Sequence, residues 1–171
     1  MKNSHGDGAV LSPMGREQAR REKLRVSRRA LLYSPAKSEG GLGMAQTKAR
    51  ILHVDDHQDT RLMMAALLQD CGYGVLTAGS VAEGLELAKE IRFDLFILDV
   101  RLPDGTGVEL CQKLRELHPT APILYYSAYG DEADHQNALN ACGDAYLTKP
   151  VCIADIQDSI ARLLAERNPS D

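Results

Sequence analysis

The chain has 171 residues, of which 44% are hydrophobic and 26% are charged, a composition typical of a folded globular protein. No apolar run approaches the roughly 20 residues that a membrane-spanning helix needs, and the N-terminus lacks the apolar stretch of a secretory signal. We therefore expect a cytoplasmic protein, with a core built mostly from aliphatic side chains because aromatic residues make up only 5%.

Charge is divided unevenly between two parts of the chain. Residues 1–47 carry nine Lys/Arg and four Asp/Glu, whereas residues 48–171 carry eleven Lys/Arg and twenty Asp/Glu. The first part is also rich in glycine and poor in apolar side chains, so we predict a disordered basic tail over 1–47 and a folded domain over 48–168. A tail of this charge suits contacts with nucleic acid or anionic lipid. The alternative is that translation starts at Met44, which peptide mapping of the native protein would decide.

The folded part alternates short apolar strands with amphipathic helices. Five strands are predicted, over residues 51–54, 73–78, 95–98, 123–126 and 145–147. Five helices are predicted between and after them: one capped by Asp59 and ended by Gly72, one opened by the capping box Ser80–Glu83, one opened by the capping box Thr106–Glu109, a weakly apolar one over 131–141 and one over 153–164. Because the strands are near-continuous apolar runs, we expect an α/β fold with a doubly wound, five-stranded parallel sheet covered by helices on both faces.

Polar side chains follow four of these strands. Asp55 and Asp56 follow the first strand, Asp99 ends the third, Ser127 follows the fourth and Lys149 follows the fifth. The carboxyl ends of parallel strands meet at one edge of the sheet, where open α/β sheets bind their ligands. We therefore expect all five side chains to share one site.

Three carboxylates in one site repel one another unless a cation neutralises them. Oxygen donors of this kind are the ligands that Mg²⁺ prefers, and Mn²⁺ accepts them as well. We predict a divalent cation held directly by Asp56, Asp99 and the Arg101 carbonyl, with Asp55 acting through water. The Lys149 ammonium would neutralise an incoming phosphoryl group, which leaves Asp99 as the nucleophile.

These residues resemble the receiver domain of bacterial two-component response regulators. The acidic pair of that family matches Asp55 and Asp56, the phospho-acceptor matches Asp99, and the conserved lysine matches Lys149. Two switch positions correspond to Ser127, followed by a small residue, and to Tyr146. The resemblance covers about residues 48–165 and implies a flavodoxin-like fold with strand order 2-1-3-4-5. It also implies a cis peptide bond before Pro150.

The resemblance implies a phosphorelay protein rather than a classical enzyme. Asp99 would take a phosphoryl group from a sensor histidine kinase or a histidine phosphotransfer protein, and the chain would catalyse only its own phosphorylation and dephosphorylation. Ser127 and Tyr146 would then move and reshape the face made by the fourth helix, the fifth strand and the fifth helix. A downstream protein target would read that face, and phosphorylation-driven homodimerisation is left open.

The chain departs from the family pattern at several positions. Cys142-Gly143 replaces the usual Gly-Ala before the fifth strand, and Val151 replaces the common Phe after Lys-Pro. Bulky side chains occupy the two positions that tune loss of the phosphoryl group in this family, Arg101 and Tyr129. They predict slow intrinsic dephosphorylation.

Three other functions compete with the receiver interpretation. A haloacid-dehalogenase-type hydrolase needs a second Asp two residues after its nucleophile, and Arg101 stands there. A transcription factor would need an effector domain, and we expect no C-terminal DNA-binding domain after residue 165. A receiver-like docking module that works without phosphorylation is the remaining alternative.

Histidine and cysteine residues give no metal-binding pattern of their own. We expect His53 to be a hydrogen-bonded core residue and His57 to point to solvent, neither of them a metal ligand. The four cysteines form no CxxC pair, so we expect scattered reduced thiols at Cys71, Cys111, Cys142 and Cys152. The adjacent Met63 and Met64 are both expected in the core.

Overall fold

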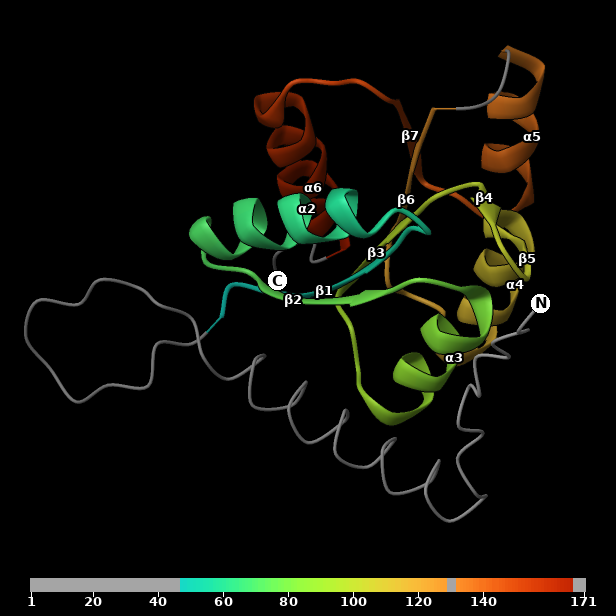
Figure 1. Cartoon of the computed structure of the whole chain (residues 1–171), viewed down its shortest axis with the longest axis horizontal. Helices are drawn as coiled ribbons and strands as arrows, with labels where there is room; N and C mark the ends of the chain where they lie inside the picture. Colours follow the sequence, from blue (N-terminus) through green and yellow to red (C-terminus); the bar gives the residue numbers. More distant parts are fainter. Residues whose placement is uncertain (1–46, 129–131, 168–171) are drawn as a thin grey trace, which may run out of the picture.

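A computed structural model describes residues 47–128 and 132–167 of the chain. The predicted tail therefore lies outside the described residues except for Thr47, and so does Tyr129. The described chain forms one five-stranded parallel sheet in the order β2-β1-β3-β6-β7 (Figure 1). The strands are β1 (Arg50–Val54), β2 (Gly74–Ala78), β3 (Leu95–Leu98), β6 (Ile123–Ser127) and β7 (Ala145–Thr148). With β6 and β7 as the fourth and fifth strands of the sheet, this is the predicted 2-1-3-4-5 order.

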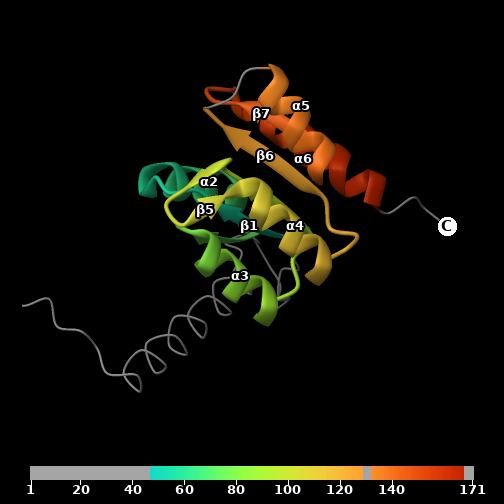
Figure 2. The same ribbon diagram turned by 90° about the vertical axis from the view of Figure 1, so that its right-hand side faces the viewer.

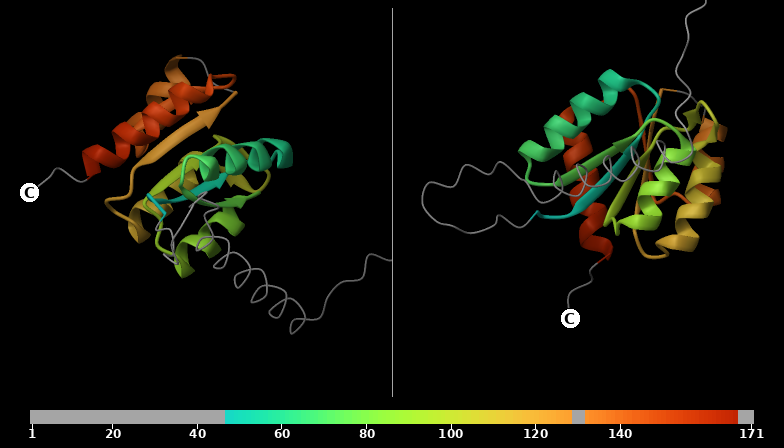
Figure 3. Two further views of the ribbon diagram at one scale, coloured as in Figure 1. Left: turned by 90° about the vertical axis from the view of Figure 1, so that its left-hand side faces the viewer. Right: turned by 60° about the horizontal axis from the view of Figure 1, so that its bottom comes forward.

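Five helices cover both faces of the sheet, as predicted (Figure 3). Helices α2 (Gln58–Asp70) and α6 (Ile153–Arg167) pack on one face. Helices α3 (Val81–Glu90), α4 (Gly107–Leu117) and α5 (Glu132–Ala141) pack on the other, with α5 beside α4 near β7 (Figure 2). No helix among the described residues is both long and apolar enough to cross a membrane.

The sheet is buried from both sides, which explains why its strands read as continuous apolar runs. In β1, Ile51 faces the α2–α6 side, whereas Leu52 and Val54 face the α3–α4 side, and all three are fully buried. All four residues of β3 are likewise fully buried. These strands hold the loops that follow them in fixed positions along one edge of the sheet.

Two details of α2 differ from the predictions. The helix begins at Gln58 with His57 as its N-cap, so Asp59 is a first-turn residue and not the cap. The reason is that the Asp55 carboxylate accepts a hydrogen bond from the His57 amide at 2.8 Å, which turns the chain immediately after β1. Met64 is buried, but Met63 is 50% exposed, because only one of two adjacent helical residues can face the sheet.

The capping boxes are confirmed to different degrees. At the start of α4, Thr106 and Glu109 each accept a hydrogen bond from the other residue's amide, so the predicted box is complete. At the start of α3, Ser80 accepts from the Glu83 amide, but the Glu83 carboxylate accepts from the amide of Gly79 instead of that of Ser80. Both helices are nonetheless fixed at the ends nearest the predicted site.

A small antiparallel hairpin after β3 was not predicted. It pairs β4 (Arg101–Leu102) with β5 (Gly105–Thr106), and its turn residue Asp104 accepts hydrogen bonds from the Val81 and Ala82 amides at 2.7 and 2.9 Å. An acidic side chain at a helix N-terminus accepts hydrogen bonds from the free amides of the helix and interacts favourably with the helix dipole. The hairpin thus ties the loop behind Asp99 to α3.

The prediction of four reduced thiols is wrong for two of them. Cys111 in α4 and Cys142, directly after α5, form a disulfide with their Cα atoms 6.1 Å apart. Cys71 and Cys152 are free. The bonded residues are 31 positions apart in sequence, and only the packing of α5 against α4 brings them together.

Candidate functional site

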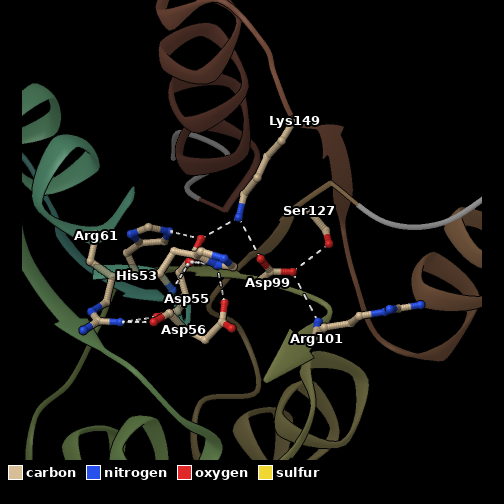
Figure 4. A network of polar contacts seen from close by, with 9 residues as sticks. His53, Asp55, Asp56, Arg61, Asp99, Arg101, Ser127 and Lys149 are labelled. Atoms are coloured by element: carbon tan, nitrogen blue, oxygen red, sulfur yellow. Dashed lines mark hydrogen bonds and ion pairs between the residues drawn. The ribbon is translucent and has the colours of Figure 1, made fainter. Parts of the chain in front are cut away.

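Four of the predicted side chains converge at the carboxyl edge of the sheet (Figure 4). Asp55 follows β1, Asp99 follows β3, Ser127 ends β6 and Lys149 follows β7. Asp55 and Ser127 are completely buried, and Asp99 is 5% exposed. The parallel register of neighbouring strands brings them to one level, since the Asp99 amide donates to the last carbonyl of β1 at 2.8 Å.

Asp99 has a hydrogen-bond donor on each carboxylate oxygen. Oδ1 accepts from the Ser127 hydroxyl at 2.6 Å and from the Arg101 amide at 3.2 Å, and Oδ2 accepts from the Lys149 ammonium at 2.7 Å. Burial alone would raise the pKa of Asp99, but the bonds from Lys149, Ser127 and Arg101 lower it below its ordinary value. Asp99 is therefore held as a carboxylate.

Lys149 bridges two carboxylates that come from different strands. Its Nζ lies 2.5 Å from Asp55 Oδ2 and 2.7 Å from Asp99 Oδ2, and 5.0 Å from the centre of the Tyr126 ring. Burial alone would lower the pKa of Lys149, but its bonds to Asp55 and Asp99 raise it. The Lys149–Pro150 peptide bond is cis, as the resemblance implied.

Arg61 supports the acidic loop and was not predicted from the sequence. Its guanidinium donates to the backbone carbonyls of Asp55 at 2.6 Å and Asp56 at 2.9 Å (Figure 4). An arginine one helical turn beyond an acidic pair is a weak signal, because such residues are usually solvent-exposed. Arg61 thus places a positive charge against the backbone of the acidic loop. It does not contact the Asp56 side chain in these bonds, and that side chain stays 41% exposed to solvent.

The acidic loop offers donor atoms suited to a cation. One ligand atom each from Asp55, Asp56 and His57 lies within 4.8 Å of the others, and His57 Nδ1 is 2.6 Å from Asp56 Oδ1. Asp99 is not part of this group, and its two carboxylate oxygens accept hydrogen bonds from Ser127 and Lys149. The structure thus joins Asp55, Asp99, Ser127 and Lys149 into one site, in which Lys149 supplies a positive charge between the two carboxylates.

Arg101 contributes to the site through its backbone. Its amide donates to Asp99, while its guanidinium extends away from that carboxylate (Figure 4). Its side chain is exposed and stands at the start of the hairpin, beside the site.

Tyr146 belongs to an aromatic cluster beneath α5. Its ring is 3.9 Å from the His135 ring and 5.9 Å from the Tyr125 ring, measured between centroids. Tyr146 is half-buried and lies opposite Tyr125 in the β6–β7 register. His135 was not identified from the sequence, because a polar residue in a weakly apolar helix gives no packing signal.

His53 is in the core, as predicted, but it is not hydrogen-bonded. Neither ring nitrogen has a hydrogen-bond partner among the described residues, and Nε2 is 3.7 Å from Asp55 Oδ2. Burial lowers the pKa of His53 to about 4, although the neighbouring Asp55 carboxylate opposes this shift. The His57 side chain is 71% exposed, which fits its expected orientation.

The chain is similar in sequence to known response regulators. The chain is 36% identical over 126 residues to the response regulator protein PilR of Pseudomonas aeruginosa, covering 74% of this chain and 28% of that protein. It is 34% identical over 115 residues to the alkaline phosphatase synthesis transcriptional regulatory protein PhoP of Bacillus subtilis, covering 67% of this chain and 48% of that protein. The chain thus spans less than half the length of these two relatives.

Solved structures show the same fold. A CheY-like response regulator receiver domain protein from Methanospirillum hungatei matches with a TM-score of 0.67 and 34% identity, covering 70% of this chain and 95% of that one. A two-component response regulator from Clostridium difficile matches with a TM-score of 0.67 and 30% identity, covering 73% of this chain and 100% of that one. The family model described as the response regulator receiver domain matches residues 51–161. The chain therefore belongs to the response regulator receiver domain family of two-component systems.

Proposed function

We propose that the chain accepts a phosphoryl group on Asp99 in a phosphorelay. One observation carries the proposal: the Asp99 carboxylate is bonded by Lys149 on one oxygen and by Ser127 on the other, at the sheet edge that also holds Asp55 and Asp56. The donor would be the phosphoimidazole of a sensor histidine kinase or a histidine phosphotransfer protein. The receiver unit would span residues 48–168.

The transfer forms a bond between an Asp99 oxygen and phosphorus and breaks the bond between phosphorus and the donor nitrogen. Lys149 stays near Asp99 and neutralises the added charge, and the Ser127 hydroxyl donates to a phosphoryl oxygen. Asp56, Asp99 and the Arg101 carbonyl would hold a magnesium or manganese ion, with Asp55 acting through water. Support for an ion at this place comes from the carboxylates of Asp55 and Asp56, which belong to a group, completed by His57, whose ligand atoms lie close enough to hold a metal. When bound, it supplies positive charge to the phosphoryl oxygens.

Phosphorylation would act on the face formed by α5, β7 and α6. Movement of Ser127 toward the phosphoryl group would free space for Tyr146, which now packs between His135 and Tyr125. A downstream protein would bind the altered face, or a second copy of the chain would pair with it. Relatives named as transcriptional regulators suggest regulation of gene expression in the cytoplasm as the wider context.

The test is intact mass after incubation with acetyl phosphate, with and without Mg²⁺. Wild type is expected to gain one phosphoryl group only with Mg²⁺, and Asp99→Asn is expected to gain none. Asp70→Asn, at the exposed end of α2, is the matched control and should behave like wild type. A folded wild-type chain that gains nothing would contradict phosphoryl acceptance and favour a docking module that works without phosphorylation.

We further propose that Arg101 and Tyr129 slow the loss of the phosphoryl group. In receiver domains a bulky side chain two residues beyond the phospho-acceptor obstructs the water that would attack phosphorus, and Arg101 occupies that position in this sequence. Arg101→Ala and Tyr129→Ala should each shorten the acyl-phosphate lifetime, measured by the decay of the phosphorylated mass. Equal lifetimes in wild type and both variants would remove this proposal.

A further inference from the structure

The disulfide between Cys111 and Cys142 joins two helices that flank the aromatic cluster of Tyr146. Cys111 lies in α4 and is fully buried, whereas Cys142 is partly exposed at the turn after α5. The Cys142 sulfur is 3.5 Å from the Tyr125 hydroxyl and 3.9 Å from the Val108 carbonyl oxygen. A thiol at Cys142 therefore also has polar partners, so the site can accommodate both oxidation states.

The turn that carries Cys142 is held by several independent contacts. The Arg115 guanidinium, on α4, donates to the Cys142 carbonyl at 2.8 Å and to the Ala121 carbonyl at 2.8 Å. Gly143 lies flat on the Tyr125 ring, and a Cβ there would come within 2.4 Å of a ring carbon. None of these contacts uses the disulfide, so we expect them to hold Cys142 near Cys111 in the reduced protein as well.

Helix α5 itself has little apolar anchoring. Among its described side chains, 135–141, Ala138 is the fully buried one. An element with few buried apolar contacts moves at low energetic cost. A covalent bond at the end of α5 would remove much of that freedom, and α5 lies next to β7 at the end of the sheet (Figure 2).

We propose that Cys111 and Cys142 form a reversible dithiol–disulfide site whose oxidation by a small-molecule disulfide fixes α5 against α4. In this state the α5–β7–α6 face responds less to phosphorylation. The second statement rests on the proposed phosphoryl acceptance by Asp99, and the first does not. Disulfides of cytoplasmic proteins are commonly transient or redox-sensing, and a bond that joins the weakly anchored α5 to the firmly packed α4 is placed to act in this way.

The chemistry balances as thiol–disulfide exchange. The Cys142 thiolate attacks the oxidant RSSR, forming a mixed disulfide and releasing one RS⁻. The Cys111 thiol then displaces the second RS⁻ and loses its proton, so two protein thiols are oxidised while RSSR is reduced to two RSH. Cys142 is the partly exposed residue of the pair, so an oxidant reaches it first, and the buried Cys111 completes the bond.

The first experiment tests the redox site on the full chain in oxidised or reduced glutathione. Oxidised wild type should lose the mass of two hydrogen atoms, and peptide mapping should recover a Cys111–Cys142 link that reduced glutathione removes. Cys71→Ser/Cys152→Ser should form the same link, and Cys142→Ser should form none. Free thiols at both Cys111 and Cys142 in oxidised glutathione, detected by alkylation after denaturation, would overturn the proposal.

The second experiment measures hydrogen exchange of α5 amides in the same buffers. Oxidation should slow exchange in wild type by roughly tenfold, within the range typical of coupling between sites, and should leave Cys142→Ser unchanged. After phosphorylation with acetyl phosphate, the change in exchange over α5 and β7 should be smaller in the oxidised protein. Equal exchange in both buffers would overturn the fixing of α5.

The two proposals fail in different ways. A chain that takes no phosphoryl group in either buffer overturns phosphoryl acceptance and the restraint on it. In that case the peptide map of the Cys111–Cys142 link and the hydrogen exchange of α5 in the unphosphorylated chain still test whether the two cysteines form a redox site.

Discussion

His53 places an imidazole without hydrogen bonds in the central region of the sheet, beside the functional site. Because burial lowers the pKa of His53 to about 4 from its ordinary 6.5, the folded state keeps this ring neutral where the unfolded chain binds a proton. Between these two pKa values, the unfolded state therefore binds more protons than the folded state. Stability should fall as the pH falls from about 6.5 to about 4, and then level off with respect to this group.

This dependence can be measured by urea unfolding across that pH window. The full loss attributable to His53 is roughly 3 kcal/mol, the free energy that corresponds to its pKa shift. His53→Leu replaces the ring with an apolar side chain of similar size that cannot titrate. Its unfolding free energy should therefore fall much less than that of wild type as the pH is lowered toward 4. The same slope in wild type and His53→Leu would contradict the assignment and point to other groups.

At the scale of elements, the start of α4 packs directly against the backbone of Asp99. A Cβ on Gly107 would lie 2.2 Å from the Asp99 carbonyl oxygen, which no side-chain movement can relieve. Gly107→Ala should therefore destabilise the protein by roughly 3 kcal/mol, at the upper end of overpacking effects, and should slow phosphoryl uptake by Asp99.

The matched variant is Gly84→Ala, in α3. A Cβ there would meet Val54 Cγ2 at 3.3 Å, a side-chain atom that can give way, and alanine favours a helix over glycine by about 1 kcal/mol. Its unfolding free energy should stay within about 1 kcal/mol of wild type. Denaturant unfolding of both variants measures the difference, and equal effects would show that the contact with Asp99 is not limiting.

The elements that the sequence predicts well are those defined by local chemistry. β3 reads as four consecutive apolar residues because it is covered on both faces, and the Thr106–Glu109 box marks the start of α4. Asp59 is not the N-cap because Asp55, an acceptor from the preceding loop, turns the chain so that α2 starts two residues earlier, after His57. The Cys111–Cys142 bond and the Arg61 contacts depend on packing between separate elements, which no local pattern encodes.

At the scale of the whole molecule, a bound divalent cation should stabilise the folded chain, because its proposed ligands come together only in the fold. Above the dissociation constant, each tenfold rise in Mg²⁺ should add about 1.4 kcal/mol to the unfolding free energy. Asp56→Asn should abolish this increase, and Asp70→Asn should retain it. Thermal unfolding over a Mg²⁺ series is the measurement, and parallel curves for wild type and Asp56→Asn would contradict the proposed ligand.

The bond between Lys149 and Asp55 spans 94 positions of the chain. It therefore cannot exist until β7 has been synthesised and has docked beside β6. Under the proposed function, a chain still emerging from the ribosome would have Asp99 but lack the ammonium that accompanies it, so it would not be a competent phosphoryl acceptor. Phosphoryl acceptance would then report completed folding, and an incomplete or misfolded copy would not compete for the phosphoryl donor.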